Sequence, residues 1–260
     1  MKASVVAIEP NGQSCTDCLV RQFSVCASLD KVEMGEFEHL SRHIHFASGE
    51  TVFAEEEMTT SFYNLLEGVM RLYKLLPDGR RQIVGFALPG DFLGMNASER
   101  NGFSADAIGA VEVCWFSKVS FLRFAKDKPH LLRRINELAI RELSQARDHM
   151  VLLGRRSAEE KVATFLIGWR DRLFRQSGPA PVVPLPMSRQ DIADYLGLTI
   201  ETVSRTFTKL EREGVIEIIP GGICLLDPAR AEAMAAAQSL DRKGRVSQSG
   251  QRLSEKIMLE

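Results

Sequence analysis

The sequence has no long hydrophobic run and no excess of charge of either sign. Its 260 residues carry 33 Lys and Arg against 34 Asp and Glu, a formal net charge of −1. Near-neutral charge argues against a protein that coats nucleic acid nonspecifically, although it is compatible with a local basic face. The N-terminus lacks the basic start and apolar run of a signal peptide, and no stretch approaches the length of a membrane span. We therefore expect a cytoplasmic protein with no membrane partner.

Sequence signals of catalysis are also missing. There is no phosphate-binding loop, no glycine-rich nucleotide fingerprint and no paired catalytic motif, so we do not expect an enzyme. Of the five histidines, His43 and His45 alternate in a predicted strand, and we interpret them as surface or core residues rather than as a metal-binding pair. The length is sufficient for two domains with cores of their own.

Cysteine is scarce, but three of the five cysteines are clustered. Cys15, Cys18 and Cys26 follow the spacing C-x2-C-x7-C, whereas Cys224 stands far away and is interpreted as a plain core or surface thiol. In a reduced compartment, clustered cysteines indicate metal more often than a disulfide. The alternative is a set of incidental buried or free thiols. A short cysteine-rich segment owes its order to whatever its thiolates bind.

The stretch 188–212, SRQDIADYLGLTIETVSRTFTKLER, predicts two short helices joined by a tight turn. Ser188 can cap a first helix from Arg189 to Leu196, and Gly197 can adopt the positive φ at which a helix ends. Thr199 can cap the second helix. We expect that helix to bury one apolar stripe and to present a polar face: the stripe is Ile200, Val203, Phe207 and Leu210, and the face is Glu201, Thr202, Ser204, Arg205 and Thr208.

Such a pair of helices also occurs in proteins that never bind DNA, but two further features favour DNA binding. The following segment, GVIEIIPGGICLL, is a hairpin signal, which predicts a winged helix-turn-helix. The run I-E-T-V-S-R strongly resembles the recognition helix of the CRP/FNR superfamily, whose FNR branch has the pattern E-x-x-S-R. The predicted contacts to double-stranded DNA are Glu201, Thr202, Ser204 and Arg205, together with Arg189 at the start of the first helix.

Residues 31–128 consist of short apolar runs punctuated by glycine, which predicts a small antiparallel barrel or roll. Gly68, Gly79 and Gly90 fall at equal intervals among the turn signals. This layout resembles the β-roll of the same superfamily, and LPDGRRQIVGFALPGDFLG is similar to its FNR-type version. Because Asp91 follows Gly90 where the cyclic-AMP-binding branch has Glu, and Arg100 lacks the expected context, we do not expect a cyclic nucleotide to bind.

Cys114 lies in VEVCWF, which alternates like a strand, and a single cysteine in a strand is usually a small core residue. Its position, however, resembles that of the fourth cluster ligand in FNR-type regulators. The resemblance therefore implies a [4Fe–4S] cluster held by Cys15, Cys18, Cys26 and Cys114. The x7 spacing departs from the best-known FNR pattern and is similar to that of the FnrN/FixK-like branch. Zinc is the alternative ligand of the four thiolates.

A long helix is predicted from about Pro129 to Arg155, and it contains a heptad seam. The seam consists of Leu132, Asn136, Ala139, Leu143, Ala146, Met150 and Leu153. The helix could instead pack entirely on its own domain, since the seam includes an asparagine and two alanines. In the superfamily this helix is the dimer interface, so the resemblance implies a homodimer whose two recognition helices reach successive major grooves.

The predicted architecture is α+β, in five parts. They are a cysteine-rich arm (1–30), a β-roll sensor domain (31–128), a dimerisation helix (129–155), a winged helix-turn-helix domain (156–238) and a flexible tail (239–260). The resemblance implies an oxygen- or redox-responsive regulator that binds a palindromic TTGAT-like operator and contacts RNA polymerase. A regulator of the same fold that senses haem, another small molecule or zinc is the main alternative. An iron–sulfur electron carrier would not account for the winged helix-turn-helix.

Overall fold

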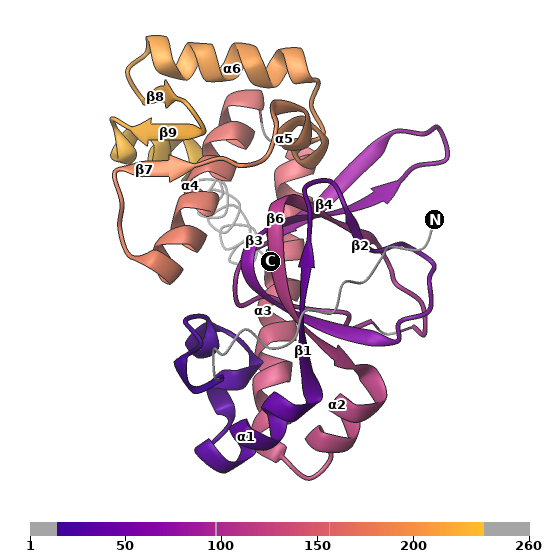
Figure 1. The fold of residues 1–260 in the computed structure, drawn as a ribbon. Helices are drawn as coiled ribbons and strands as arrows, with labels where there is room; N and C mark the ends of the chain where they lie inside the picture. Colours follow the sequence, from indigo (N-terminus) through magenta and orange to yellow (C-terminus); the bar gives the residue numbers. More distant parts are fainter. Residues whose placement is uncertain (1–14, 97, 156, 237–260) are drawn as a thin grey trace, which may run out of the picture. The chain divides into compact units, whose positions relative to one another are not determined.

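A computed structural model describes residues 15–96, 98–155 and 157–236 (Figure 1). The chain divides into two compact units. The first comprises residues 1–150 with residues 186–197, and the second comprises residues 151–185 with residues 198–260. The predicted flexible tail at 239–260 lies outside the described residues, as do the first fourteen residues of the predicted cysteine-rich arm.

The first unit begins with three single-turn 3-10 helices that carry the cysteine cluster: η1 (Cys15–Asp17), η2 (Arg21–Phe23) and η3 (Val25–Ser28). They lead into α1 (Lys31–Leu40), whose start is fixed by a capping box. Asp30 accepts from the Glu33 backbone N–H, and the Glu33 side chain accepts from the Asp30 backbone N–H. The cysteine segment therefore has local turns but no long element of its own.

The core of this unit is a six-stranded antiparallel sheet, as the β-roll prediction requires. Its strands are β1 (Ser41–Phe46), β2 (Thr51–Phe53), β3 (Ser61–Leu75), β4 (Arg81–Ala87), β5 (Phe92–Leu93) and β6 (Ser104–Ser117). The main path is β1-β6-β3-β4, with β2 on β6 and β5 on β3. Thus β6 lies at the centre and contacts both the first strand and the longest one.

Gly68 lies inside a strand and not in a turn, although it falls at the same interval as Gly79 and Gly90. The pairing of β3 with β6 shifts register between Glu67 and Val69, and Gly68 adopts a φ of 86° there. A Cβ at Gly68 would lie 2.3 Å from the Ala110 carbonyl oxygen, so only glycine fits this bulge. The bulge lets β3 run on for 15 residues, whereas Gly79 and Gly90 do lie in turns, as predicted.

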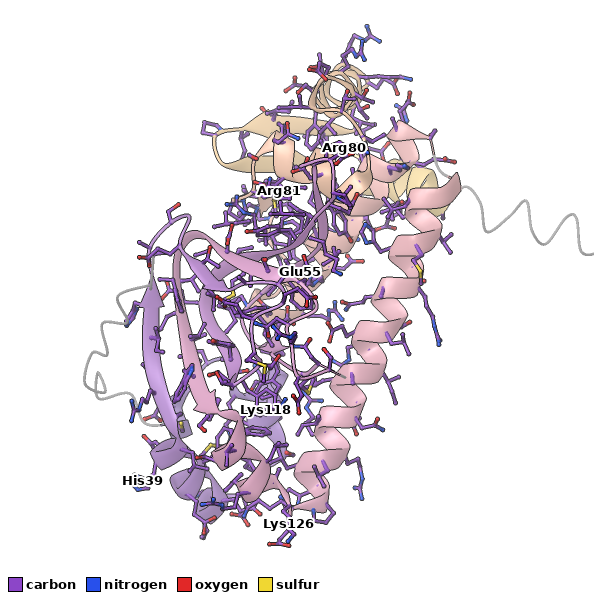
Figure 2. The ribbon with its side chains drawn as sticks, turned by 90° about the vertical axis from the view of Figure 1, so that its right-hand side faces the viewer. His39, Glu55, Arg80, Arg81, Lys118 and Lys126 are labelled. Atoms are coloured by element: carbon purple, nitrogen blue, oxygen red, sulfur yellow. The ribbon has the colours of Figure 1, made fainter. Side chains whose placement is uncertain are left out.

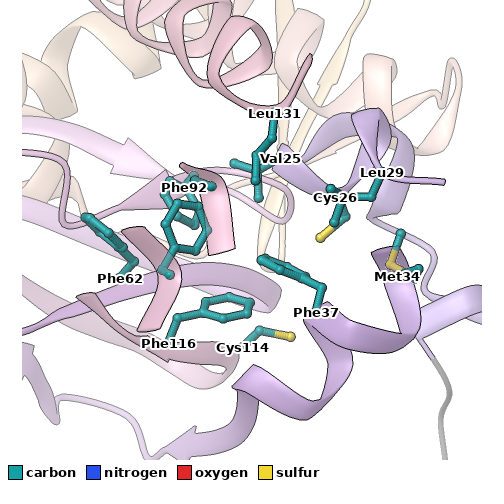
Figure 3. Packing of buried hydrophobic residues seen from close by; sticks show 12 residues of the cluster. Val25, Cys26, Leu29, Met34, Phe37, Phe62, Phe92, Cys114, Phe116 and Leu131 are labelled. Atoms are coloured by element: carbon teal, nitrogen blue, oxygen red, sulfur yellow. The ribbon is translucent and has the colours of Figure 1, made fainter. Parts of the chain in front are cut away.

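An aromatic core joins the cysteine segment to this sheet (Figure 3). Phe37 of α1 stacks near Phe116 of β6, with ring centroids 4.6 Å apart, and both rings are about 1% exposed. Helix α2 (Lys118–Ala125) adds Phe121 to the same cluster. Since Val25 and Cys26 of η3 are buried in this core, the cysteine segment is packed on the domain.

Helix α3 spans Pro129–Arg155, the bounds that the sequence predicted. Its residues 129–150 belong to the first unit, as does α5 (Arg189–Leu196). The second unit contains α4 (Ala158–Ser177), which opens on a capping box formed by Ser157 and Glu160. It also contains α6 (Ile200–Arg212), followed by a hairpin of β8 (Ile216–Ile219) and β9 (Gly222–Leu225), which confirms the predicted wing.

The proline-rich segment SGPAPVVPLP, residues 177–186, contains a short strand. Residues Val182–Pro184 form β7, which pairs with β9 at the edge of a three-stranded sheet. Val183 is buried in the middle of this short strand. An edge position tolerates proline because one side of the strand needs no ladder hydrogen bond. Residues 228–236, after the wing, are helical. Across the described ranges, no helix is both long and apolar enough to cross a membrane.

Candidate nucleic-acid interface and metal centre

Helix α6 begins where the sequence placed it and buries most of its predicted stripe. Thr199 caps it, accepting from the Thr202 backbone N–H at 3.3 Å. Val203, Phe207 and Leu210 are buried. The prediction for Ile200 is wrong: this residue is 38% exposed, because it is the first residue of the helix. Thr206 is buried instead, and its hydroxyl donates to the Thr202 carbonyl at 2.8 Å.

The opposite face of α6 is accessible and polar. Glu201, Ser204 and Arg205 are exposed, and Thr202 is half-buried. Hydrogen bonds from its own backbone N–H and from the Thr199 hydroxyl lower the pKa of the Glu201 carboxyl, and the nearby Arg205 lowers it further. Glu201 is therefore an ionised acceptor and Arg205 a fixed cationic donor, a pair that can bond cytosine and guanine edges respectively.

Helix α5 has the predicted caps and apolar side. The Ser188 hydroxyl accepts from the Asp191 backbone N–H at 3.0 Å, and Gly197 ends the helix at a φ of 61°. The buried residues are Ile192, Ala193 and Leu196, each 0% exposed. Arg189, a predicted DNA contact, is only half-exposed, and burial lowers its pKa. It is thus less accessible than Arg205.

Three of the four predicted cluster ligands belong to the aromatic core or pack against it. Cys26 of η3 and Cys114 of β6 are both buried members of it, 8% and 6% exposed, and both lie close to Phe37 in Figure 3. Cys15 packs against the same core and is half-buried. Cys18 is half-buried as well. Cys224 is a half-buried thiol of β9 in the other unit, in keeping with its interpretation as a plain thiol.

These thiols influence one another electrostatically. Burial, and then the neighbouring cysteines and Glu38, raise the pKa of Cys15 to about 12. Burial likewise raises the pKa of Cys26 to about 11, with a further contribution from Cys18, while the Ser24 hydroxyl acts in the opposite direction. Burial and the other three cysteines raise the pKa of Cys114. Deprotonating Cys15, Cys26 and Cys114 at neutral pH therefore requires a compensating cation, which is what a metal supplies.

Four cysteine thiols are the donors that an iron–sulfur cluster requires, and here they lie near enough to influence one another electrostatically. Within the described ranges, however, no three His, Cys, Asp or Glu side chains are arranged to hold a metal ion. A hollow of about 440 Å³ borders the segment and is lined by Cys18, Leu19, Arg21, Gln22 and Ala27. The donors are thus close enough to interact, and binding would require the 15–26 segment to close on Cys114.

Sequence reasoning missed that His43 lies against Cys114. The two residues are register partners on β1 and β6, and His43 Nε2 is 3.7 Å from the Cys114 sulfur. On its other side, His43 Nδ1 is 2.7 Å from Glu112 Oε1. The alternation of His43 and His45 predicted a strand but not its partner, which is 71 residues away. Glu112 fixes the ring so that Nε2 faces the sulfur, the arrangement by which outer residues orient metal ligands.

Most of the predicted seam of α3 is exposed in the single chain. Leu132 is 46% exposed, Leu143 51% and Met150 64%, and Leu153 is half-buried. The remaining members, Asn136, Ala139 and Ala146, are exposed as well. Another side of the same helix packs on the aromatic core through Leu131, Ile135 and Leu138. One face of α3 therefore serves its own domain, while an apolar face is left uncovered.

The two residues weighed against a cyclic-nucleotide site are engaged within the protein. The Asp91 carboxylate accepts from the Leu88 backbone N–H at 2.8 Å in the turn that contains Gly90. Arg100 is exposed and donates to the Glu56 carbonyl oxygen at 2.5 Å.

Comparison with known proteins gives two matches to family models. Residues 185–216 match the bacterial regulatory proteins of the crp family, and residues 43–128 match the cyclic nucleotide-binding domain. These matches correspond to the α5–α6 region and to the β-sheet domain.

Similar individual proteins are bacterial regulators. The chain is 76% identical over 237 residues to the nitrogen fixation regulation protein FixK of Bradyrhizobium diazoefficiens, covering 91% of this chain and all of that protein. It is 36% identical to the transcriptional activator protein FnrL of Cereibacter sphaeroides, over 78% of this chain and 84% of FnrL. The solved structure of FixK2 from Bradyrhizobium japonicum superposes with a TM-score of 0.70 at 37% identity, covering 75% of this chain and 96% of that one.

Proposed function

The chain belongs to the crp family of bacterial regulatory proteins, in its FNR-type, FixK-like branch, and is a DNA-binding transcription regulator rather than an enzyme; from this we propose that it is an oxygen- or redox-responsive activator. In this proposal a [4Fe–4S] cluster on four cysteines controls a homodimer that binds a palindromic operator. The regulated genes would serve low-oxygen metabolism, and RNA polymerase would be contacted at the promoter.

The observation that supports the sensor part is the gathering of three thiols in one core, with Cys18 close enough to influence them electrostatically. Cys26 and Cys114 are buried together with Cys15 packed beside them, and their proximity and burial disfavour loss of their protons without a bound cation. A [4Fe–4S] cluster needs four thiolates and, once bound, supplies a centre that oxygen can convert or destroy. Zinc is the alternative occupant, because a set of four thiolates suits it equally in chemical terms.

The DNA part of the proposal rests on the exposed face of α6. Arg205 would donate bidentately to a guanine edge, Glu201 would accept from a cytosine amino group, and Ser204 would approach a thymine methyl or the backbone. Thr202 and Arg189 would contribute at the rim. The half-site inferred from the family resemblance is TTGAT-like, and two such half-sites in inverted repeat require a two-fold dimer.

The uncovered face of α3 supports the dimer. Exposed Leu132, Leu143 and Met150 repeat at heptad positions, and they alternate with the small residues Ala139 and Ala146. Such a seam buries little apolar surface per chain and gives a weak coiled coil. A weak dimer is one that a sensor can switch, since a few kcal/mol suffices to move a balanced equilibrium.

The test is iron and acid-labile sulfide per chain, with the visible spectrum, on full-length protein purified without oxygen. About four of each, with bleaching in air alongside loss of dimer and of DNA binding, is the expected result. Zinc in place of iron, or DNA binding indifferent to air in metal-free protein, would overturn the sensor assignment. Neither outcome would affect the assignment of α6.

A further inference from the structure

Two arginines of the six-stranded sheet β1–β6, called the sensor sheet below, contact α5, the first helix of the DNA-binding motif. Both belong to the same compact unit, residues 1–150 with residues 186–197. Arg81, the first residue of β4, donates from Nη2 to Asp191 Oδ1 at 2.6 Å and to Asp194 Oδ2 at 2.8 Å. Its Nε donates to the same Asp194 oxygen at 2.9 Å. The Arg81 guanidinium thus donates hydrogen bonds to two carboxylates, Asp191 and Asp194, on successive turns of α5.

Arg71 of β3 extends this contact into the sheet. Its Nη1 lies 3.4 Å from Asp191 Oδ1, and its Nη2 lies 3.3 Å from Asp106 Oδ2 on β6. Its Nε is buried with no hydrogen-bond partner among the residues that the structure describes. Arg71 therefore divides its donors between the central strand β6 and helix α5. Both of its hydrogen bonds are long, at 3.3 and 3.4 Å.

The carboxylate at the centre of the contact is buried and charged. The Asp191 side chain is 5% exposed, and that of Asp194 is 14% exposed. Burial alone would raise the pKa of Asp191, but hydrogen bonds from the Ser188 hydroxyl and backbone and the charges of Arg81 and Arg71 lower it. A buried carboxylate loses much of its stabilisation when its cation is withdrawn, so the helix cannot leave this position without cost.

Uncharged contacts hold the C-terminal end of α5 in the same place. The Gln82 side chain donates to the Asp194 carbonyl oxygen at 2.6 Å. The Tyr195 ring stacks on His149 of α3, with centroids 4.1 Å apart and planes at 9°, and it lies 5.5 Å from the Phe86 ring of β4. His149 Nε2 also donates to the Tyr195 carbonyl oxygen at 2.8 Å. Helix α5 therefore contacts both the sensor sheet and the long helix.

We infer that Arg71, Arg81, Asp191 and Asp194 form a clamp through which the sensor sheet sets the position of α5, and so the DNA affinity of the helix pair. One strand connects the clamp to the cysteine site, because Asp106 and Cys114 both lie on β6, eight positions apart. Arg71 contacts both Asp106 of β6 and Asp191 of α5, so a displacement of β6 would alter the contact of Arg71 with Asp191. The inference depends on DNA binding but not on which cofactor the cysteines hold.

The test is a double-mutant cycle in full-length protein with Arg81→Gln, Asp194→Asn and both together. Arg80→Gln is the matched control, because Arg80 is the adjacent hairpin arginine and its 79% exposed side chain pairs only with Asp78 among the contacts described (Figure 2). The probe is a duplex that the wild-type chain selects from a random pool, and the readout is its Kd at fixed salt. Failure to select any duplex would count against the proposed function, not against the clamp.

We expect each clamp variant to change this Kd by about fivefold or more in the same direction, with little further change in the double variant. Arg80→Gln should stay within about twofold of wild type. Tighter binding would mean that the clamp holds the state that does not bind DNA, and weaker binding would mean that it belongs to the bound state. Single variants within twofold of wild type, or effects that multiply in the double variant, would overturn the inference.

Hydrogen exchange keeps the test decisive if the variants lose stability. Arg81→Gln should speed amide exchange in α5 while leaving the strand β6 protected, because only the helix loses a partner that holds it. Uniform loss of protection would indicate general destabilisation, and unchanged exchange in α5 would show that the clamp does not hold the helix. Either of these results would also overturn the inference.

Discussion

The helix pair near residue 200 and the cysteine segment near residue 20 differ in how complete each is without an added component. In α5 and α6 the caps, the buried stripe and the exposed polar face are all formed by the chain. In the cysteine segment the thiols are brought near one another, yet the described residues contain no group of three donors that could hold a metal. The first region is formed by the chain itself, whereas the described residues of the second do not by themselves form a metal site.

The difference follows from the range of the interactions involved. A cap or a buried stripe depends on residues three or four positions apart, whereas the cysteine site combines Cys26 with Cys114, which is 88 residues further along the chain by number. Because burial raises the pKa of Cys15 and Cys26, both thiols stay protonated at neutral pH unless a bound cation favours their thiolates. A site of this kind is specified by its ligand as much as by its fold.

The largest expected effect is the loss of iron and sulfide from a variant of the cysteine segment alone. Cys26→Ser should reduce iron and sulfide in anaerobically purified protein from about four per chain to nearly none, because serine replaces a thiolate donor with a poor one. Cys224→Ser is the matched control and should keep the wild-type content, since Cys224 is on β9 in the other unit. Equal iron in the two variants would remove Cys26 from the ligand set.

The second effect concerns the α6 face. Arg205→Ala should cost about 1–3 kcal/mol in binding to the selected operator but much less on random DNA, because the lost contact is to a base edge. Arg212→Ala removes the same charge from an exposed position in the last turn of α6 and should weaken both duplexes about equally. The measurement is the Kd for each duplex at one salt concentration. An Arg205 variant that loses affinity equally for both would show that Arg205 only contacts phosphate.

The smallest expected effect tests whether a local signal, the N-cap of α6, stabilises the helix pair. Thr199→Ala should lower the free energy of unfolding by about 1 kcal/mol, because the N-cap of α6 loses its hydroxyl acceptor. Thr208→Ala makes the same chemical change on the exposed side of that helix and should be close to neutral. Urea unfolding of the two variants provides the comparison, and equal midpoints would show that the cap does not matter.

The parts that could be predicted from the sequence are those governed by neighbours along the chain. Ser188, Gly197 and Thr199 mark the helix ends correctly, and Pro129–Arg155 is one helix as its apolar spacing indicated. Ile200 was assigned to the core on spacing alone, but spacing does not say that a first-turn side chain lies beyond the packed face. Gly68 falls at the same interval as the turn glycines Gly79 and Gly90, but spacing does not show that its positive φ serves a bulge inside β3.

The parts that could not be predicted depend on pairing between distant strands and helices. The three residues of β7 form a strand only because β9 lies alongside, and His43 meets Cys114 only through the register of β1 on β6. The contact of Arg81 with Asp191 spans 110 positions. Alternation identifies the face of a strand, but no short-range pattern identifies its neighbour.

The uncovered apolar face of α3 has a consequence for the amount of protein in a cell. If DNA is bound by two chains joined along this weak seam, then at low occupancy the concentration of dimer rises with the square of the number of chains. Doubling synthesis of the chain would then raise the dimer by about fourfold before any signal changes. The exposed Leu132, Leu143 and Met150 would thus make the copy number of the chain an input of its own to DNA binding.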